Sequence, residues 1–234
     1  MLPAPTDEGV NEYFTMLGDG VVTLWERLRD DLPGWAVEYR FPNETNLIEE
    51  YRQRSKDISD LENRLRDFDR LKRVLVLQSE PLVDAIIDLF DKIFQLKLRR
   101  EEAFREDLTL LDPQGNVVAL IEVKGVNGGV GREHVNQADS HRARADLPLE
   151  FPSLLIVNTH MKASKSLADK DKAVATEQIV HAARNNVLIL RSLDLLNLAS
   201  LLLSGKLDLE GVIELLTKSS GWLRVSETAA VLKG

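Results

Sequence analysis

Two carboxylates and one lysine have the types and spacing of a reactive site. Asp107 opens a short apolar stretch that we expect to be a strand, and Glu122-Val123-Lys124 ends the next one. Glu122 and Lys124 are two residues apart, so on a strand both side chains point to the same face. The turn-forming sequence 112–116 joins the two strands as a hairpin and sets Asp107 opposite Ile121 or Glu122. The sequence therefore predicts that two carboxylates and an ammonium group converge.

Oxygen ligands of this kind suit Mg²⁺ or Mn²⁺, which keep several waters and bridge to phosphate oxygens. A lysine beside such an ion can orient or deprotonate an attacking water, or neutralise charge that develops on phosphorus. Charged residues at strand ends are also often just solvated, which is the simpler interpretation. Against it, Glu122-Val123-Lys124 is the only acid-any-lysine triplet in the chain and ends an apolar strand, where a carboxylate needs a partner or an ion.

The pattern of Asp107, fourteen intervening residues and Glu122-x-Lys124 resembles the active-site signature of the PD-(D/E)xK, or restriction-endonuclease-like, nuclease superfamily. The resemblance extends from Ser79 to about Asn197. It implies that Asp107, Glu122 and the backbone carbonyl of Val123 bind Mg²⁺ or Mn²⁺. It further implies that Lys124 assists the attacking water.

Many members of that superfamily place a glutamine on the helix after the lysine strand, and Gln137 resembles it. The helical glutamate of several members is replaced by Val83, so Glu80 or Asp84 would have to substitute. Helical spacing sets Gln137, His141 and Arg144 on one face, which could meet a phosphate or simply be solvated. The candidate nucleic-acid contacts are Arg132, His141, Arg142, Arg144, Lys162 and Lys165.

Two other motifs carry weaker alternatives. The loop Gly125–Gly131 joins a strand to a helix, as phosphate-binding loops do, but it lacks the Gly-Lys-Ser/Thr ending and the G-x-G-x-x-G spacing. A loop that faces the substrate is the other interpretation. His134 and His141 could form a zinc pair, although no further ligands are spaced to complete the shell.

The elements that position these residues follow an α/β pattern. We expect a helix from Ser79, capped by Ser79, and then strands around Phe94–Leu98, Leu108–Leu111 and Val117–Val123. Next come a polar helix Arg132–Ala145, a buried strand Leu154–Val157, a helix Asp169–Arg184 and a strand Val187–Leu190. Two short helices and a corner at Gly221-Trp222 end the chain. The expected fold class is a restriction-endonuclease-like core: helix, three-strand meander, helix, strand, helix, strand.

An amphipathic region precedes this core. Apolar residues at alternating 3-4 spacing predict a long helix over Asn43–Leu77, with Tyr51, Ile58 and Leu65 on its stripe. We expect that stripe to pack against a helix around Asn11–Arg29 or against another chain. The domain prediction is an acidic helical accessory or dimerisation region (residues 1–78), a nuclease core (79–200) and a helical extension (201–234).

Charge and composition limit the function classes. The net charge of -8 falls entirely within residues 1–94, which hold 12 Lys and Arg against 20 Asp and Glu. That part would repel a phosphate backbone, so we expect nucleic-acid contacts in the remainder. The chain has no cysteine, which excludes disulfides and thiolate chemistry, and we see neither a signal peptide nor a membrane span.

We therefore expect a cytoplasmic, metal-dependent nuclease that acts on DNA, as a homodimer or with a protein partner through the amino-terminal helices. The fold analogy alone suggests the substrate. The alternative is a catalytically silent module of the same fold that binds nucleic acid or a protein partner, for example in a defence complex.

Overall fold

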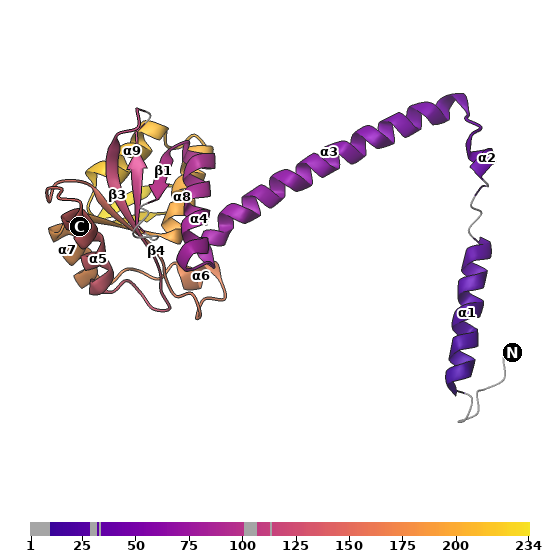
Figure 1. The fold of residues 1–234 in the computed structure, drawn as a ribbon, viewed down its shortest axis with the longest axis horizontal. Helices are drawn as coiled ribbons and strands as arrows, with labels where there is room; N and C mark the ends of the chain where they lie inside the picture. Colours follow the sequence, from indigo (N-terminus) through magenta and orange to yellow (C-terminus); the bar gives the residue numbers. More distant parts are fainter. Residues whose placement is uncertain (1–9, 29–31, 33, 101–106, 113) are drawn as a thin grey trace. The chain divides into compact units, whose positions relative to one another are not determined.

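The computed structural model describes residues 10–28, 32, 34–100, 107–112 and 114–234, but not the side chains of 11, 25–28 and 107. Contacts divide the chain into two compact units, Met1–Leu61 and Glu62–Gly234, which we call the helical unit and the sheet unit. Residues 101–106 and the turn residue Pro113 lie outside the described residues. Figure 1 shows the elements of both units.

The amino-terminal elements are helices: α1 (Val10–Leu28), α2 (Gly34–Val37) and α3 (Pro42–Lys72). Helix α3 is 31 residues long and includes residues of both units. At its start the Glu44 carboxylate accepts the backbone N–H of Phe41 at 3.1 Å, which satisfies one donor of the first turn. The predicted helix Asn43–Leu77 thus ends earlier, at Lys72, and a short 3-10 turn η1 (Arg73–Leu75) follows.

The sheet unit contains a seven-stranded mixed sheet in the order β1-β2-β3-β4-β5-β6-β7. β1, β2 and β3 form an antiparallel meander, β3 to β6 run parallel, and β7 returns antiparallel to β6. The strands are β1 (Lys97–Arg100), β2 (Asp107–Leu111), β3 (Val117–Gly125), β4 (Ser153–Asn158), β5 (Val187–Arg191), β6 (Gly221–Val225) and β7 (Ala230–Lys233).

Helices cover both faces of this sheet (Figure 1). On one face α4, α8 and α9 pack over strand residues such as Ile121 and Ile156. On the other, α5 and α7 pack over alternate residues such as Leu155 and Val157. Each central strand is therefore apolar on both sides, as expected for parallel strands. The helices are α4 (Ser79–Leu89), the π-helix η2 (Phe90–Phe94), α5 (Arg132–Arg144), α6 (Leu167–Lys170), α7 (Thr176–Arg184), α8 (Ser192–Leu203) and α9 (Leu209–Lys218).

Three local predictions were wrong. Ser79 has a positive φ of 51° and is the first residue of α4, while Gln78 is the N-cap. Phe94 ends the π-helix instead of opening a strand: Gln95, with a positive φ of 55°, is the C-cap of that helix, and β1 begins only at Lys97. The expected helix Asp169–Arg184 is two helices, α6 and α7, separated by an extended stretch.

The chain beyond residue 200 also differs from expectation. The predicted corner at Gly221-Trp222 is the start of β6, and β6 and β7 extend the sheet by a hairpin. Gly221 has a φ of +91°, and a Cβ there would lie 2.3 Å from the carbonyl oxygen of Lys233. Only glycine fits this position, so the residue marks a close strand pairing that resembled a simple turn in the sequence.

Candidate functional site

The β2–β3 hairpin sets the positions of the two acidic candidates. In its turn, Asp112 Oδ1 accepts the backbone N–H groups of Gln114 and Asn116 at 2.9 and 2.8 Å. Hydrogen bonds from the side chain and backbone of Asn116 lower the pKa of Asp112. After a one-residue register shift between Leu110 and Leu111, the hairpin pairs Asp107 with Glu122, which is one of the two partners that the sequence allowed. Asp107 therefore occupies the backbone position directly opposite Glu122.

Glu122 and Lys124 form an ion pair at the end of β3. Lys124 Nζ lies 2.8 Å from Glu122 Oε1, which confirms that the two side chains share a face of the strand. Glu122 is only 4% exposed, whereas Lys124 is 19% exposed. In the register Glu122 pairs with Leu155, whose side chain belongs to the core under α5 and α7. The ion pair thus lies on the α5 face of the sheet, at the carboxyl end of a central strand.

The first turn of α5 faces this ion pair. His134 Nδ1 accepts the backbone N–H of Gly131 at 2.9 Å and so caps the helix. Burial lowers the pKa of His134, the Glu133 carboxylate opposes this effect, and the Lys124 ammonium lowers the pKa further. Because α5 packs against β3, the helix start lies close enough to the strand end for the Lys124 charge to act on His134.

The start of α4 approaches the same strand end. A Cβ on Gly125 would lie 3.0 Å from Gln78 Cβ and 3.1 Å from Met161 Sδ, so the α4 start and the segment after β4 pack tightly against the backbone there. Asn158, the last residue of β4, donates from Nδ2 to the carbonyl oxygen of Leu77 at 2.8 Å. The first turn of α4, with the half-buried Glu80, is therefore held against the carboxyl ends of β3 and β4.

A buried lysine fixes this arrangement. Lys170 Nζ donates to Asn158 Oδ1 at 2.7 Å and to the Thr159 carbonyl oxygen at 2.8 Å, and burial lowers the pKa of Lys170. Asn158 and Lys170 are positioning residues that the sequence patterns did not single out. One signal was available: Asn158 is the polar residue that directly follows the apolar run Leu154–Val157.

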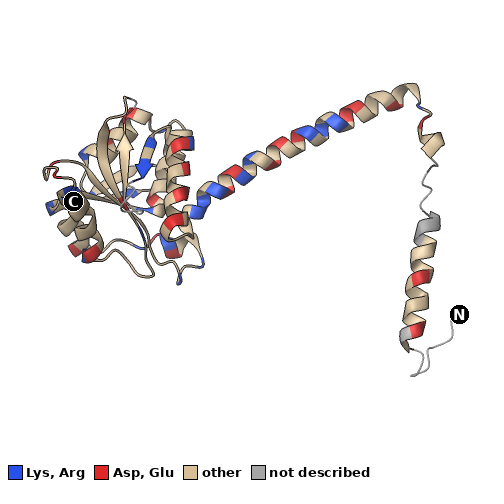
Figure 2. Cartoon of the chain, in the orientation of Figure 1, with Lys and Arg blue, Asp and Glu red and all other residues tan. Residues whose placement is uncertain are grey.

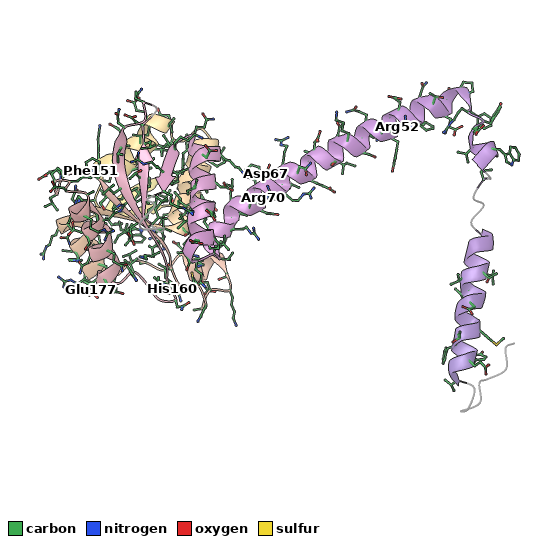
Figure 3. The ribbon with its side chains drawn as sticks, in the orientation of Figure 1. Arg52, Asp67, Arg70, Phe151, His160 and Glu177 are labelled. Carbon is green, nitrogen blue, oxygen red and sulfur yellow. The ribbon has the colours of Figure 1, made fainter. Side chains whose placement is uncertain are left out.

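The glycine-rich loop is tied to the segment after β4 by backbone hydrogen bonds. Val126 N–H donates to the Asn158 carbonyl, and Met161 N–H returns to the Val126 carbonyl, at 2.8 and 3.2 Å. His160 N–H donates to the Gly128 carbonyl at 2.9 Å. His160, labelled in Figure 3, has a φ of 52°, and burial followed by the charges of Lys172, Lys170 and Arg191 lowers its pKa. Only the Val126 bond uses an N–H group of the loop, which is the kind of donor that a phosphate-binding loop keeps for its ligand; the other two bonds use loop carbonyl oxygens.

The candidate nucleic-acid contacts divide into exposed and buried groups. Arg142 is only 2% exposed, and its guanidinium donates to the carbonyl oxygens of Phe151, Asn185 and Asn186 and to the Asp139 carboxylate. This arginine therefore holds two loops together, and our expectation of a surface contact was wrong. His141 is also buried, at 6% exposure. The exposed candidates are Gln137 on α5, with Arg132, Arg144, Lys162 and Lys165.

The donor set was tested for a divalent cation. Among the side chains that the structure describes, no group of three or more His, Cys, Asp or Glu residues could hold a metal ion. His134 and His141 are therefore not part of such a group. The Asp107 side chain is outside that set. Mg²⁺ and Mn²⁺ need only one or two protein carboxylates, because water and substrate oxygens complete their shells. Glu122, the Val123 carbonyl and a carboxylate at position 107 have the oxygen chemistry that this requires.

Comparisons of the chain with models of protein families, with curated proteins and with solved structures found no match. A search of the described helices for one long and apolar enough to cross a bilayer also found none.

Proposed function

We propose that this protein is a metal-dependent nuclease with a restriction-endonuclease-like core made of α4, the β1–β3 meander, α5 and β4. One observation carries the proposal: the register sets Asp107 opposite Glu122, and Lys124 Nζ lies 2.8 Å from the Glu122 carboxylate. The element order supports it, since a helix and an antiparallel meander are followed by a helix and a parallel strand.

In this proposal Asp107, Glu122 and the Val123 carbonyl hold Mg²⁺ or Mn²⁺, which when bound supplies positive charge to a phosphate and lowers the pKa of a coordinated water. Lys124, partly exposed at the strand end, donates to the attacking water or to a phosphate oxygen. Its contact with Glu122 fixes the ammonium position in advance. Gln137 on α5 is a further candidate donor to the water or the phosphate.

We propose DNA as the substrate. The sheet unit has exposed cations near the carboxyl ends of the central strands and on α5, whereas residues 1–94 carry all the acidic excess. Cations that contact phosphates contribute much of the affinity for a nucleic acid. Arg132, Arg144, Lys162 and Lys165 remain candidates for this contact. The helical unit would then mediate a homodimer or bind a protein partner.

The test is a cleavage assay on linear and supercoiled DNA with Mg²⁺ or Mn²⁺, and with a chelator as the blank. Asp107→Ala, Glu122→Ala and Lys124→Ala should each lower the rate by at least about a hundredfold. The matched control is Glu177→Ala, an exposed carboxylate on α7 (Figure 3), which should cut normally. Cleavage at the wild-type rate by the Glu122→Ala protein would exclude the catalytic assignment.

One feature favours a second candidate, a catalytically silent module of the same fold that binds nucleic acid or a protein. The Glu122 carboxylate already has a cation, Lys124, which can satisfy a buried charge without any metal. DNA binding that is equal with chelator and with Mg²⁺, combined with no cleavage under any of these conditions, would support this alternative.

A further inference from the structure

Helix α3 has an exposed seam of regular spacing. Starting at Leu47, the seam advances by alternating steps of four and three residues, which is the heptad spacing of a coiled coil. Its apolar side chains are exposed: Tyr51 at 73%, Ile58 at 57% and Leu65 at 65%. An exposed apolar stripe of this size on one helix is typical of an interaction surface, which another element covers in the assembled protein. The seam positions are Leu47, Tyr51, Arg54, Ile58, Leu61, Leu65, Phe68 and Lys72.

We propose that the cover is α3 of a second copy of this chain, packed in the antiparallel direction. The seam cations, Arg54 and Lys72, and the charged residues beside the seam favour this direction. Blue and red residues intermingle along α3 in Figure 2, so the relative direction of two copies decides which charges meet. The proposal is independent of the nuclease assignment.

A parallel pair would juxtapose like charges. In a parallel coiled coil each seam residue faces its own copy, so Arg54 would face the partner's Arg54 inside the seam. The flanking residue Asp57 would lie beside the partner's Glu62, five positions further along, and the reciprocal contact would repeat the repulsion. Only Arg64, beside the partner's Asp69, would gain an opposite charge. The balance in this direction is unfavourable.

An antiparallel pair centred between Ile58 and Leu61 removes these conflicts. Ile58 then faces the partner's Leu61, and Tyr51 faces the partner's Phe68. Arg54 faces the partner's Leu65, so its aliphatic stem can cover the leucine while its guanidinium stays on Glu50 of its own helix, 2.5 Å away.

The charges beside the seam also become complementary. In the antiparallel pair Asp57 lies beside the partner's Arg64, and the twofold axis produces this contact twice. Both residues are exposed on α3, where such a pair can form without moving the backbone. The seam is therefore self-complementary in one direction only, which is the requirement for a twofold contact between identical surfaces.

Helix α1 is the competing occupant. It also exposes apolar side chains, including Phe14, Met16 and Leu24. However, Glu12 and Asp19, the charged residues of its first three turns, are both acidic, and its one cation, Arg27, stands in the last turn next to Glu26 in the sequence. Its interior contains Gly18 and Gly20, which weaken a helix. A second α3 satisfies the seam and its charges together.

Charge reversal at Asp57 in the whole chain tests the direction of the helix pair, because the dimer weakens if the pair is antiparallel and tightens if it is parallel. Asp57→Lys and Arg64→Asp should each raise the dimer dissociation constant, measured by analytical ultracentrifugation, by about tenfold, because two attractive contacts become repulsive. The double variant exchanges the charges and should restore the affinity to within about threefold. The matched controls, Asp60→Lys and Arg52→Asp, lie on the outer face of α3 (Arg52 is labelled in Figure 3). Each should change the dimer dissociation constant by less than about twofold.

Disulfide trapping gives a second readout, since the chain has no cysteine of its own. Oxidation of a mixture of Ile58→Cys and Leu61→Cys proteins should yield mostly the mixed dimer, because these positions face each other only in the antiparallel pair. Oxidation of Ile58→Cys alone should give little covalent dimer.

Three results would overturn the proposal. A dimer that tightens with Asp57→Lys and forms the Ile58→Cys homodisulfide is parallel. A dimer that no charge change on α3 affects uses another surface, such as α1. A protein that stays monomeric at every concentration has no such contact. None of these outcomes affects the test for DNA cleavage, because cleavage can be assayed separately, with the monomer as well.

Discussion

The Arg191–Asp194 and Glu122–Lys124 ion pairs of the sheet unit differ in how far the surrounding protein buries them. Arg191 and Asp194 are 1% and 0% exposed, and Arg191 Nε lies 2.6 Å from Asp194 Oδ2. Asp194 also accepts Trp222 Nε1–H and the Val225 backbone N–H, each at 3.0 Å. Burial alone would lower the pKa of Arg191, but hydrogen bonds and charge from Asp194, and then from Asp171, raise it.

The Glu122–Lys124 pair is more open. Its acid is buried, but its lysine is 19% exposed at the end of β3, among loops and helix starts. The Arg191–Asp194 pair, in contrast, links α8 to β6, and its polar atoms hydrogen-bond to other protein groups. The difference indicates that the Arg191–Asp194 pair stabilises the fold, whereas the Glu122–Lys124 pair stays accessible to solvent and to a ligand. The predictions below test that distinction through the free energy of unfolding.

The largest expected effect is at Asp194. Asp194→Ala leaves the Arg191 guanidinium buried beside Trp222 without its main counterion, which should lower the free energy of unfolding by about 3–5 kcal/mol. Chemical denaturation measures this change. Asp171→Ala removes the other, 45% exposed, partner of Arg191 and should cost less than about 1 kcal/mol. Equal effects at both positions would contradict the closed character of the Arg191–Asp194 pair.

Arg142 belongs with the closed pair in this comparison. Arg142→Met removes donors to three backbone carbonyls and should lower the free energy of unfolding by about 2–3 kcal/mol. Arg144→Met, at an exposed position two residues later, should cost less than about 0.5 kcal/mol. If DNA affinity falls with Arg144→Met at unchanged stability, the contact surface lies on the exposed side of α5.

The sequence predicted the shared face of Glu122 and Lys124 and the hairpin register to within one residue, because a period of two and a tight turn act locally. It did not reveal the register shift between Leu110 and Leu111 that selects Glu122 over Ile121. It could not reveal that Arg142 is buried, since an arginine on a polar helix is typical of a solvated face. The carbonyls that bind Arg142 come from residues 9 to 44 positions away. The role of Gly221 was missed for a related reason: its pairing with Leu188 of β5 and its close approach to Lys233 of β7 join segments that no local period connects.

The open pair should tolerate neutralisation. Glu122→Gln keeps the size and hydrogen-bonding capacity of the side chain and removes any repulsion from the carboxylate at position 107. We expect the free energy of unfolding to change by no more than about 1 kcal/mol, while cleavage is lost. The same denaturation assay measures it. A loss as large as that of Asp194→Ala would place Glu122 among the structural ion pairs.

The smallest expected effect concerns pH and His134, whose Nδ1 must be unprotonated to accept the Gly131 N–H. Burial holds the pKa of His134 in the folded protein below the ordinary 6.5, so on acidification the unfolded chain binds a proton first. Stability from this group is therefore present above about pH 6.5 and is lost as the pH falls toward the folded pKa.

His134→Gln separates the cap from the titration, because glutamine at this helix position can also bond back to the N-cap N–H but does not ionise. Between about pH 7.5 and about pH 5.5 the wild type should lose a few tenths of a kcal/mol more stability than His134→Gln, by denaturation at each pH. His160, whose pKa is also lowered, titrates in both proteins and cancels in the difference. Parallel pH profiles would mean that protonated His134 is accommodated beside Lys124, and hence that solvent screens the open pair more than its burial indicates.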